Sequence, residues 1–216
     1  VSGLLNVVTD SPEIARLAAD HLLRCGFRQF AYCGDASADP SSSWSELRRE
    51  YFRRYVCEAG FEIHDYRIHP AAGARDWTKE RRLLAQWLQG LPKPIGLMAC
   101  NDDCGVQVME ACKWAGLVVP DQIGVIGADD DEIICGLANP PMSSVAINFE
   151  RAGYEAARAL DQLMRKQSRV PKRIAAHPTH IVARRSTDIV AVADPTVAKA
   201  LRFMRDQARQ AMDVAD

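Results

Sequence analysis

The sequence has no apolar run close to the roughly 18 residues that a membrane-spanning helix needs, and no stretch that resembles a secretory leader. It also has no excess of charge, because 27 Lys and Arg stand against 28 Asp and Glu in 216 residues. A chain with a net charge of −1 is not expected to bind nucleic acid by its own surface. The catalytic patterns GxSxG and GxGxxG and the phosphate-binding loop are missing as well. These absences favour a binding module over an enzyme.

Paired cysteines are also missing. The seven cysteines are odd in number and include no CxxC pair, which is typical of free thiols in a reducing cytoplasm. Cys100 and Cys104 stand four residues apart, as two metal ligands on one helical face would. No histidine or third cysteine completes the set at the usual spacing. We therefore expect neither a metal site nor a cofactor.

What the sequence does contain is a regular alternation of strand and helix patterns. Four mostly apolar runs begin about 30 residues apart, which is the length of one β-α-β unit. Such strands, each followed by a helix, imply a parallel sheet with helices on both faces, and so an α/β fold. The expected strands are Gln29–Gly34, Phe61–Ile68, Ile95–Cys100 and Ile123–Ala128, and the expected helices are Glu13–Cys25, Trp44–Ala59, Trp77–Gln89 and Asp102–Ala115.

The alternation changes after Ala128. An acidic turn, Asp129–Glu132, and the helix breaker Asn139-Pro140-Pro141 come before a short apolar piece. This part of the chain is expected to contain the apolar piece Ser144–Ile147, a long helix over Phe149–Arg165, a strand over Ile181–Arg184 and a last helix from Pro195.

Polar and aromatic residues follow each of the four expected strands. In open parallel sheets, ligands bind beyond the carboxyl ends of the strands, where loops and helix N-termini converge. Paired donors and acceptors bind vicinal hydroxyls there, and an indole covers the apolar face of a sugar ring. The pattern therefore predicts a small polyhydroxylated ligand. The residues are Trp44 and Arg48 after the first strand, Trp77 after the second, Asn101 and Asp102 after the third, and Asp129 and Asp130 after the fourth.

Each of these residues also has a simpler interpretation. Arg48 belongs to an arginine-rich helix whose charged face could be merely solvated, and Asn101 could cap the helix that follows it. Trp77 could be a core residue. The acidic turn Asp129–Asp131 could be merely exposed, and together with Asp102 it could instead hold Mg²⁺, as in phosphate-transfer enzymes. The residues alone leave these alternatives open.

Longer motifs point to a known family. They include VVTD (Val7–Asp10), WSELRREYF (Trp44–Phe52) and LPKPIGLMACND (Leu91–Asp102). More specific are VIGADDDE with NPPMSSV after it, and RRSTD followed by ADPTVAKALRFMR. Through these motifs the sequence resembles, from Val8 to about Ala208, the sensor region of the xylose operon regulators. These are bacterial activators in which a LacI/GalR-like, periplasmic-binding-protein-like sensor precedes an AraC-type DNA-binding domain.

The resemblance implies a type I periplasmic-binding-protein-like fold with a ligand cleft between two lobes, of which this chain supplies mostly the C-terminal lobe. It also implies roles for particular residues by their position in the motifs. Arg48 matches the arginine that grips the sugar, Asn101 the asparagine at its strand end, Asp129 the carboxylate of the turn and Trp77 the stacking aromatic; Trp44 and Glu13 fall near the pocket, and Asp10 and Ile147 match the hinges.

The same resemblance implies a division of the chain. The expected segments are a hinge and the end of the N-terminal lobe over 1–10, the C-terminal lobe over 11–128, a returning N-terminal-lobe segment over 129–177, a return to the C-terminal lobe over 178–190, and a linker helix over 191–216 toward a DNA-binding domain absent from this chain.

The expected function is sugar sensing without catalysis, in the cytoplasm, for a transcription regulator that responds to a pentose such as D-xylose. DNA would be contacted only through the absent domain, no membrane would be involved, and the full-length regulator would be a homodimer. Two alternatives remain at this point: a periplasmic-type sugar-binding protein of the same fold, and a Mg²⁺-dependent α/β phosphate-transfer enzyme.

Overall fold

The computed structural model describes residues 5–35, 44–68, 77–165 and 170–189, together with the separate helical residues Thr196, Ala200, Phe203 and Met204. The side chain of Trp77 and most of the helix expected from Pro195 lie outside the described residues. Among the residues described, no helix combines the length and the apolar character needed to cross a membrane.

Most of the described chain forms one six-stranded sheet. Its order is β3-β2-β4-β5-β6-β8, and its first five strands run parallel. The last strand, β8, runs antiparallel to β6, so the expectation of a parallel sheet holds for all strands but this edge strand. The strands are β2 (Phe30–Asp35), β3 (Ile63–Ile68), β4 (Ile95–Ala99), β5 (Ile123–Asp129), β6 (Ser143–Ile147) and β8 (Pro178–Val182).

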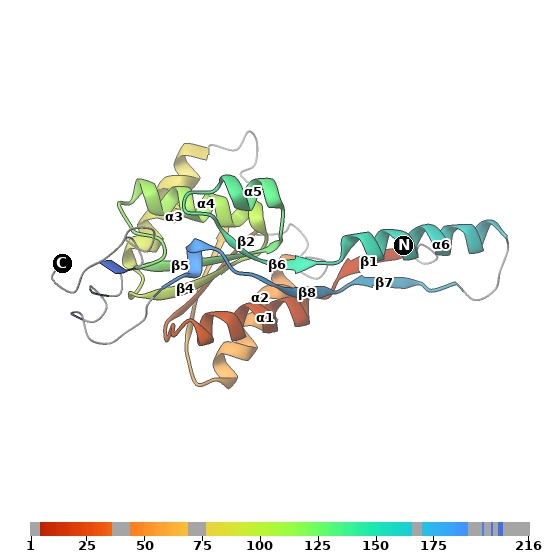
Figure 1. Cartoon of the computed structure of the whole chain (residues 1–216), viewed down its shortest axis with the longest axis horizontal. Helices are drawn as coiled ribbons and strands as arrows, with labels where there is room; N and C mark the ends of the chain where they lie inside the picture. Colours follow the sequence, from red (N-terminus) through yellow and green to blue (C-terminus); the bar gives the residue numbers. More distant parts are fainter. Residues whose placement is uncertain are drawn as a thin grey trace.

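Helices cover both faces of this sheet, as the apolar character of its central strands requires. Figure 1 shows α1 and α2 on one face and α3, α4 and α5 on the other. The ring of Phe27 lies directly against Gly96 and Gly124 of the central strands, where a larger residue would collide with it. The helices are α1 (Ser11–Arg24), α2 (Trp44–Glu58), α3 (Trp77–Gly90), α4 (Asp102–Trp114) and α5 (Glu132–Leu137).

A second, smaller body extends from one end of the main sheet (Figure 1). In it, β1 (Asn6–Thr9) pairs in parallel with β7 (Arg173–Ala176), and the long helix α6 (Phe149–Met164) packs against β7. The chain passes between the two bodies three times, after Thr9, after Ile147 and after Ala176. β1 and β7 were not expected from the sequence, because each has only four residues and they pair across more than 160 positions of chain.

The structure divides the chain at a different point from the expected boundary after Ala128. The acidic turn leads into the short helix α5, whose first turn is capped by Asp131, and β6 then pairs with β5 in the main sheet. The chain therefore stays with the larger body as far as Ile147. The predicted boundary differs because Asn139-Pro140-Pro141 lies in a loop between α5 and β6, within the larger body, and does not mark a passage to the smaller body.

Candidate ligand-binding site

Arg48 is the centre of the candidate site. It lies on the second turn of α2 and is only 1% exposed. Its guanidinium donates through Nη1 to the carbonyl of Cys100 and through Nη2 to Thr9 Oγ1 at 3.3 Å. Arg48 Nε is buried and has no hydrogen-bond partner among the described residues. A buried guanidinium that remains charged needs such partners, and this one keeps a donor to spare.

The indole of Trp44 covers this guanidinium. The centre of its ring lies 5.0 Å from the Arg48 Cζ, within the range of a cation–π contact. Trp44 is nevertheless 43% exposed, so part of the indole faces solvent while it contacts the buried charge. The interpretation of Arg48 as part of a solvated helix face is wrong.

Asp129 lies on the same edge of the sheet, at the last position of β5. Burial raises its pKa to about 6, the charge of Arg48 opposes this rise, and the carboxylates of Asp102 and Asp103 add to it. Asp129 and Asp130 both have positive φ, at 111° and 56°, which is unusual outside glycine. The turn therefore holds a carboxylate close to the guanidinium in a conformation that its surroundings must maintain.

Asn101 follows β4 and caps α4. Its Oδ1 accepts a hydrogen bond from the Cys104 amide at 3.0 Å, as the capping interpretation predicted. No hydrogen bond from its Nδ2 to another of the described residues accompanies this cap. The bond from Arg48 to the Cys100 carbonyl brings Asn101 next to the arginine.

Asp102 has an internal structural role. It is 2% exposed, and Ser144 Oγ donates to its Oδ1 at 2.6 Å while the Asp131 amide donates to its Oδ2 at 2.8 Å. Both carboxylate oxygens therefore accept hydrogen bonds that connect the start of α4 to β6 and to the residue that caps α5. No group of three His, Cys, Asp or Glu side chains among the described residues is placed to hold a metal ion.

The two other expected site residues are Trp77 and Glu13, and only Glu13 has a described side chain. The backbone of Trp77 begins α3, but its side chain lies outside the described residues. Glu13, on the first turn of α1, forms an ion pair with Arg16, whose Nη2 lies 2.5 Å from Glu13 Oε1. Hydrogen bonding to Arg16 is the main reason why the pKa of Glu13 is lowered.

The expected hinge residues lie where the chain passes between the two bodies. The Asp10 amide donates to the Ala176 carbonyl at 3.0 Å, and Asp10 Oδ2 lies 2.7 Å from His177 Nδ1. The Asn148 amide, directly after Ile147, donates to the His177 carbonyl at 2.9 Å. All three crossings are thus linked through one residue, His177.

Sequence reasoning missed Thr9, Ser144 and His177. Thr9 stands in the VVTD motif beside the expected hinge, and Ser144 in the NPPMSSV motif, so both had a local signal. Their contacts, to Arg48 and Asp102 respectively, connect residues 39 and 42 positions apart. Such pairings depend on the tertiary fold and are not visible in local spacing.

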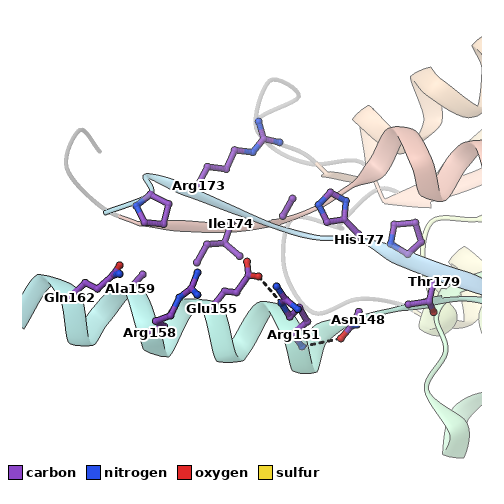
Figure 2. Close-up of a pocket in the computed structure, with 13 residues that line it drawn as sticks. Asn148, Arg151, Glu155, Arg158, Ala159, Gln162, Arg173, Ile174, His177 and Thr179 are labelled. Carbon is purple, nitrogen blue, oxygen red and sulfur yellow. Dashed lines mark hydrogen bonds and ion pairs between the residues drawn. The ribbon is translucent and has the colours of Figure 1, made fainter. Parts of the chain in front are cut away.

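A separate cavity of about 510 Å³ lies in the smaller body, between α6 and β7 (Figure 2). Arg151, Glu155 and Arg158 of α6 line it from one side, and His177 lines its end near the hinge. Arg151 is paired with Glu155 at 2.6 Å, and the side chain of Arg173 points away from the helix. None of the expected sugar-binding residues lines this cavity.

The raised pKa of Asp129 predicts a pH-dependent stability. Its carboxyl titrates near pH 6 in the folded protein and near its usual 3.8 when unfolded, so folding favours the protonated form. This contribution is complete below about pH 4 and is lost as the pH rises through 6. Thermal unfolding from pH 4 to 7 should show the wild type losing about 2 kcal/mol relative to Asp129→Asn, which cannot ionise. Parallel pH profiles for the two proteins would contradict the burial of this carboxylate.

The fold and the site together define the class of protein. Two α/β bodies joined by three crossings, with polar groups gathered where the strands of the larger body end, are the architecture of a two-lobed binding protein. The profile of the family described as "Periplasmic binding protein-like domain" matches residues 19–187. The chain belongs to this family.

Within it, the chain is similar to the xylose operon regulatory proteins. It is 30% identical to the one from Haemophilus influenzae over 94% of this chain and 52% of that protein, and 30% identical to the one from Escherichia coli K12 over 96% and 53%. It therefore spans about half the length of these curated relatives. The solved structure of a xylose-binding transcription activator, XylR, matches all of this chain and 56% of that chain, with a TM-score of 0.82 and 29% identity.

The lac repressor, solved as a dimer with operator and an anti-inducer, is a more distant neighbour. It matches 84% of this chain and 52% of its own, with a TM-score of 0.66 and 25% identity. The expected periplasmic-binding-protein-like fold and the resemblance to xylose regulators are both confirmed.

Proposed function

We propose that this chain is the sugar-sensing part of a bacterial transcription regulator and that its ligand is a pentose of the D-xylose type. The observation that carries the proposal is the gathering of Arg48, Asn101 and Asp129 at one edge of the main sheet, each with unused capacity for a hydroxyl. The similarity to xylose operon regulators supports the choice of sugar.

The three groups offer complementary chemistry to a sugar. Arg48 has a free Nε donor, and its bond to Thr9 at 3.3 Å is long enough to be exchanged for a shorter one. Asn101 Nδ2 supplies a second donor, and ionised Asp129 accepts from a hydroxyl. Charge-assisted bonds of this kind are stronger and more directional than neutral ones. Trp44, which covers the guanidinium, supplies an aromatic face for the C–H side of the ring.

The position of Thr9 couples this site to the smaller body. Thr9 ends β1, directly before the first crossing, and its hydroxyl is bound to Arg48. A sugar that takes over Arg48 Nη2 therefore changes a contact between the two bodies. Binding can shift their arrangement only as far as the sugar prefers one arrangement over the other.

Calorimetric titration with D-xylose tests the proposal, in the longest natural form of the protein that contains this chain. We expect saturable binding, and at a sugar concentration 100 times Kd a stabilisation of about 2.7 kcal/mol. L-arabinose, D-glucose, and Mg²⁺ with a phosphate ester serve as comparisons. Stabilisation and phosphatase activity with Mg²⁺, in the absence of any sugar response, would contradict the proposal and favour an enzyme.

The proposal extends to the rest of the regulator. DNA binding is assigned to an AraC-type domain outside this chain, the site is assigned no catalytic step, and the regulator is taken to act in the cytoplasm as a homodimer. All seven cysteines are free thiols, which is compatible with a reducing compartment.

A further inference from the structure

Arg184 makes an ion pair with the turn that carries the candidate ligand carboxylate. Its Nη1 lies 2.9 Å from Asp130 Oδ1, and the two side chains are only 19% and 16% exposed. The same nitrogen donates to the carbonyl of the fully buried Met142 at 3.0 Å. The guanidinium therefore bridges the end of β5 and the start of β6.

The backbone of Arg184 is fixed independently of its side chain. Its amide donates to Ser143 Oγ at 2.8 Å, and its carbonyl accepts from the same hydroxyl at 3.0 Å. Ser143 Oγ also lies 2.7 Å from Thr187 Oγ1, which in turn lies 2.8 Å from His21 Nε2 of α1. Replacing only the side chain of Arg184 should thus leave the segment 184–189 attached to the main sheet.

Three contacts hold the Asp129–Asp131 turn in its strained conformation. Ser144 Oγ accepts from the Asp130 amide at 3.1 Å, Asp102 accepts from the Asp131 amide, and Arg184 holds the Asp130 carboxylate. The first contact comes from the neighbouring strand β6, and the second comes from the first residue of helix α4. Of the three residues that make these contacts, Arg184 alone belongs to the exit segment, which is the stretch 184–189 that follows β8.

We propose that Arg184 is a positioning residue that couples the ligand-site turn to the exit segment 184–189 through Asp130. A ligand bound to Asp129 contacts the turn whose next residue, Asp130, forms the ion pair with Arg184 of the exit segment. Ligand binding at the site should therefore reduce the local opening of the exit segment. This inference rests on the proposed function for the identity of the ligand. The contact itself is independent of it.

Hydrogen exchange tests the contact without ligand. In Arg184→Gln, amides of the turn Asp129–Asp131 should exchange about 10-fold faster than in the wild type, and Asp130→Asn should have the same effect. The double variant should exchange no faster than either single variant, because both remove one interaction. Arg54→Gln, which removes an exposed ion pair with Glu58 on α2, is the matched control and should leave these amides unchanged.

Addition of D-xylose tests the coupling. In the wild type the sugar should slow exchange in 185–189, and in Arg184→Gln this slowing should be lost at saturating sugar, while the affinity falls about 5-fold. The proposal would be overturned if, without ligand, the effects of Arg184→Gln and Asp130→Asn on the exchange rate added up in the double variant. It would also be overturned if D-xylose slowed exchange in 185–189 as much in Arg184→Gln as in the wild type. If the wild type binds no sugar, the proposed function fails, and the ligand-free exchange still decides whether Arg184 holds the turn.

Discussion

Arg48→Met should lower the affinity for D-xylose by at least 100-fold. The substitution removes a buried donor group that makes charge-assisted hydrogen bonds, each worth about 1.5–3 kcal/mol, or about 10- to 150-fold in Kd. It also removes the charge that opposes the rise in the pKa of Asp129, so that this carboxyl should titrate above 6. Calorimetric titration at pH 7.5 measures the first effect, and the pH dependence of stability measures the second.

Arg54→Met is the control for this prediction. It makes the same substitution on the same helix, where the arginine side chain is 65% exposed and pairs with Glu58. Exposed pairs of this kind contribute little, so sugar affinity should stay within about 2-fold of the wild type. Equal sugar affinity in Arg48→Met and the wild type would show that the guanidinium does not contact the ligand.

Gly127→Ala should cost about 3 kcal/mol of unfolding free energy, which for a chain of this size corresponds to a fall in Tm of about 6–12 °C. A methyl group at this position would overlap Asp102 Oδ1 and lie 3.2 Å from the Asp102 Cα. Because Asp102 accepts hydrogen bonds from Ser144 and from the Asp131 amide, its side chain cannot move away without breaking them. The start of α4 must therefore move, and Asn101 with it.

Gly153→Ala separates this collision from a general effect of replacing glycine. Gly153 lies in α6, and nothing stands within 4 Å of an added methyl group. Alanine is the better helix former by about 1 kcal/mol, so this variant should be as stable as the wild type or more so. Similar thermal unfolding curves for Gly127→Ala and the wild type would contradict the close contact between β5 and α4.

The main sheet could be predicted from the sequence because its signals are local. The apolar runs beginning at Ile95 and Ile123 became β4 and β5 within one residue of the expected ends, and the helix after β4 begins as expected at Asp102. The short helix α5 after β5 was not expected. The smaller body could not be predicted in the same way. β1 and β7 are short, and their pairing of Asn6 with Arg173 is set by the crossings and not by sequence spacing.

The sequence could predict which end of the sheet carries the candidate residues, but it could not predict their contacts. The rule that ligands bind at the carboxyl ends of parallel strands selected Arg48, Asn101 and Asp129, and the structure places them on one edge. The rule could not separate Asp129 from Asp102, which differ in their contacts although both lie at the end of a strand. That difference arises because Ser144 and the Asp131 amide occupy both oxygens of Asp102.

A crystal structure of the protein with D-xylose tests the central claim most directly. The account predicts a sugar bound beyond the ends of β4 and β5, with hydroxyl oxygens about 3 Å from the Arg48 guanidinium and the Asp129 carboxylate, and with Trp44 against the ring. A sugar bound elsewhere, with Arg48 still joined to Thr9 and covered by Trp44 as in the unliganded protein, would contradict it.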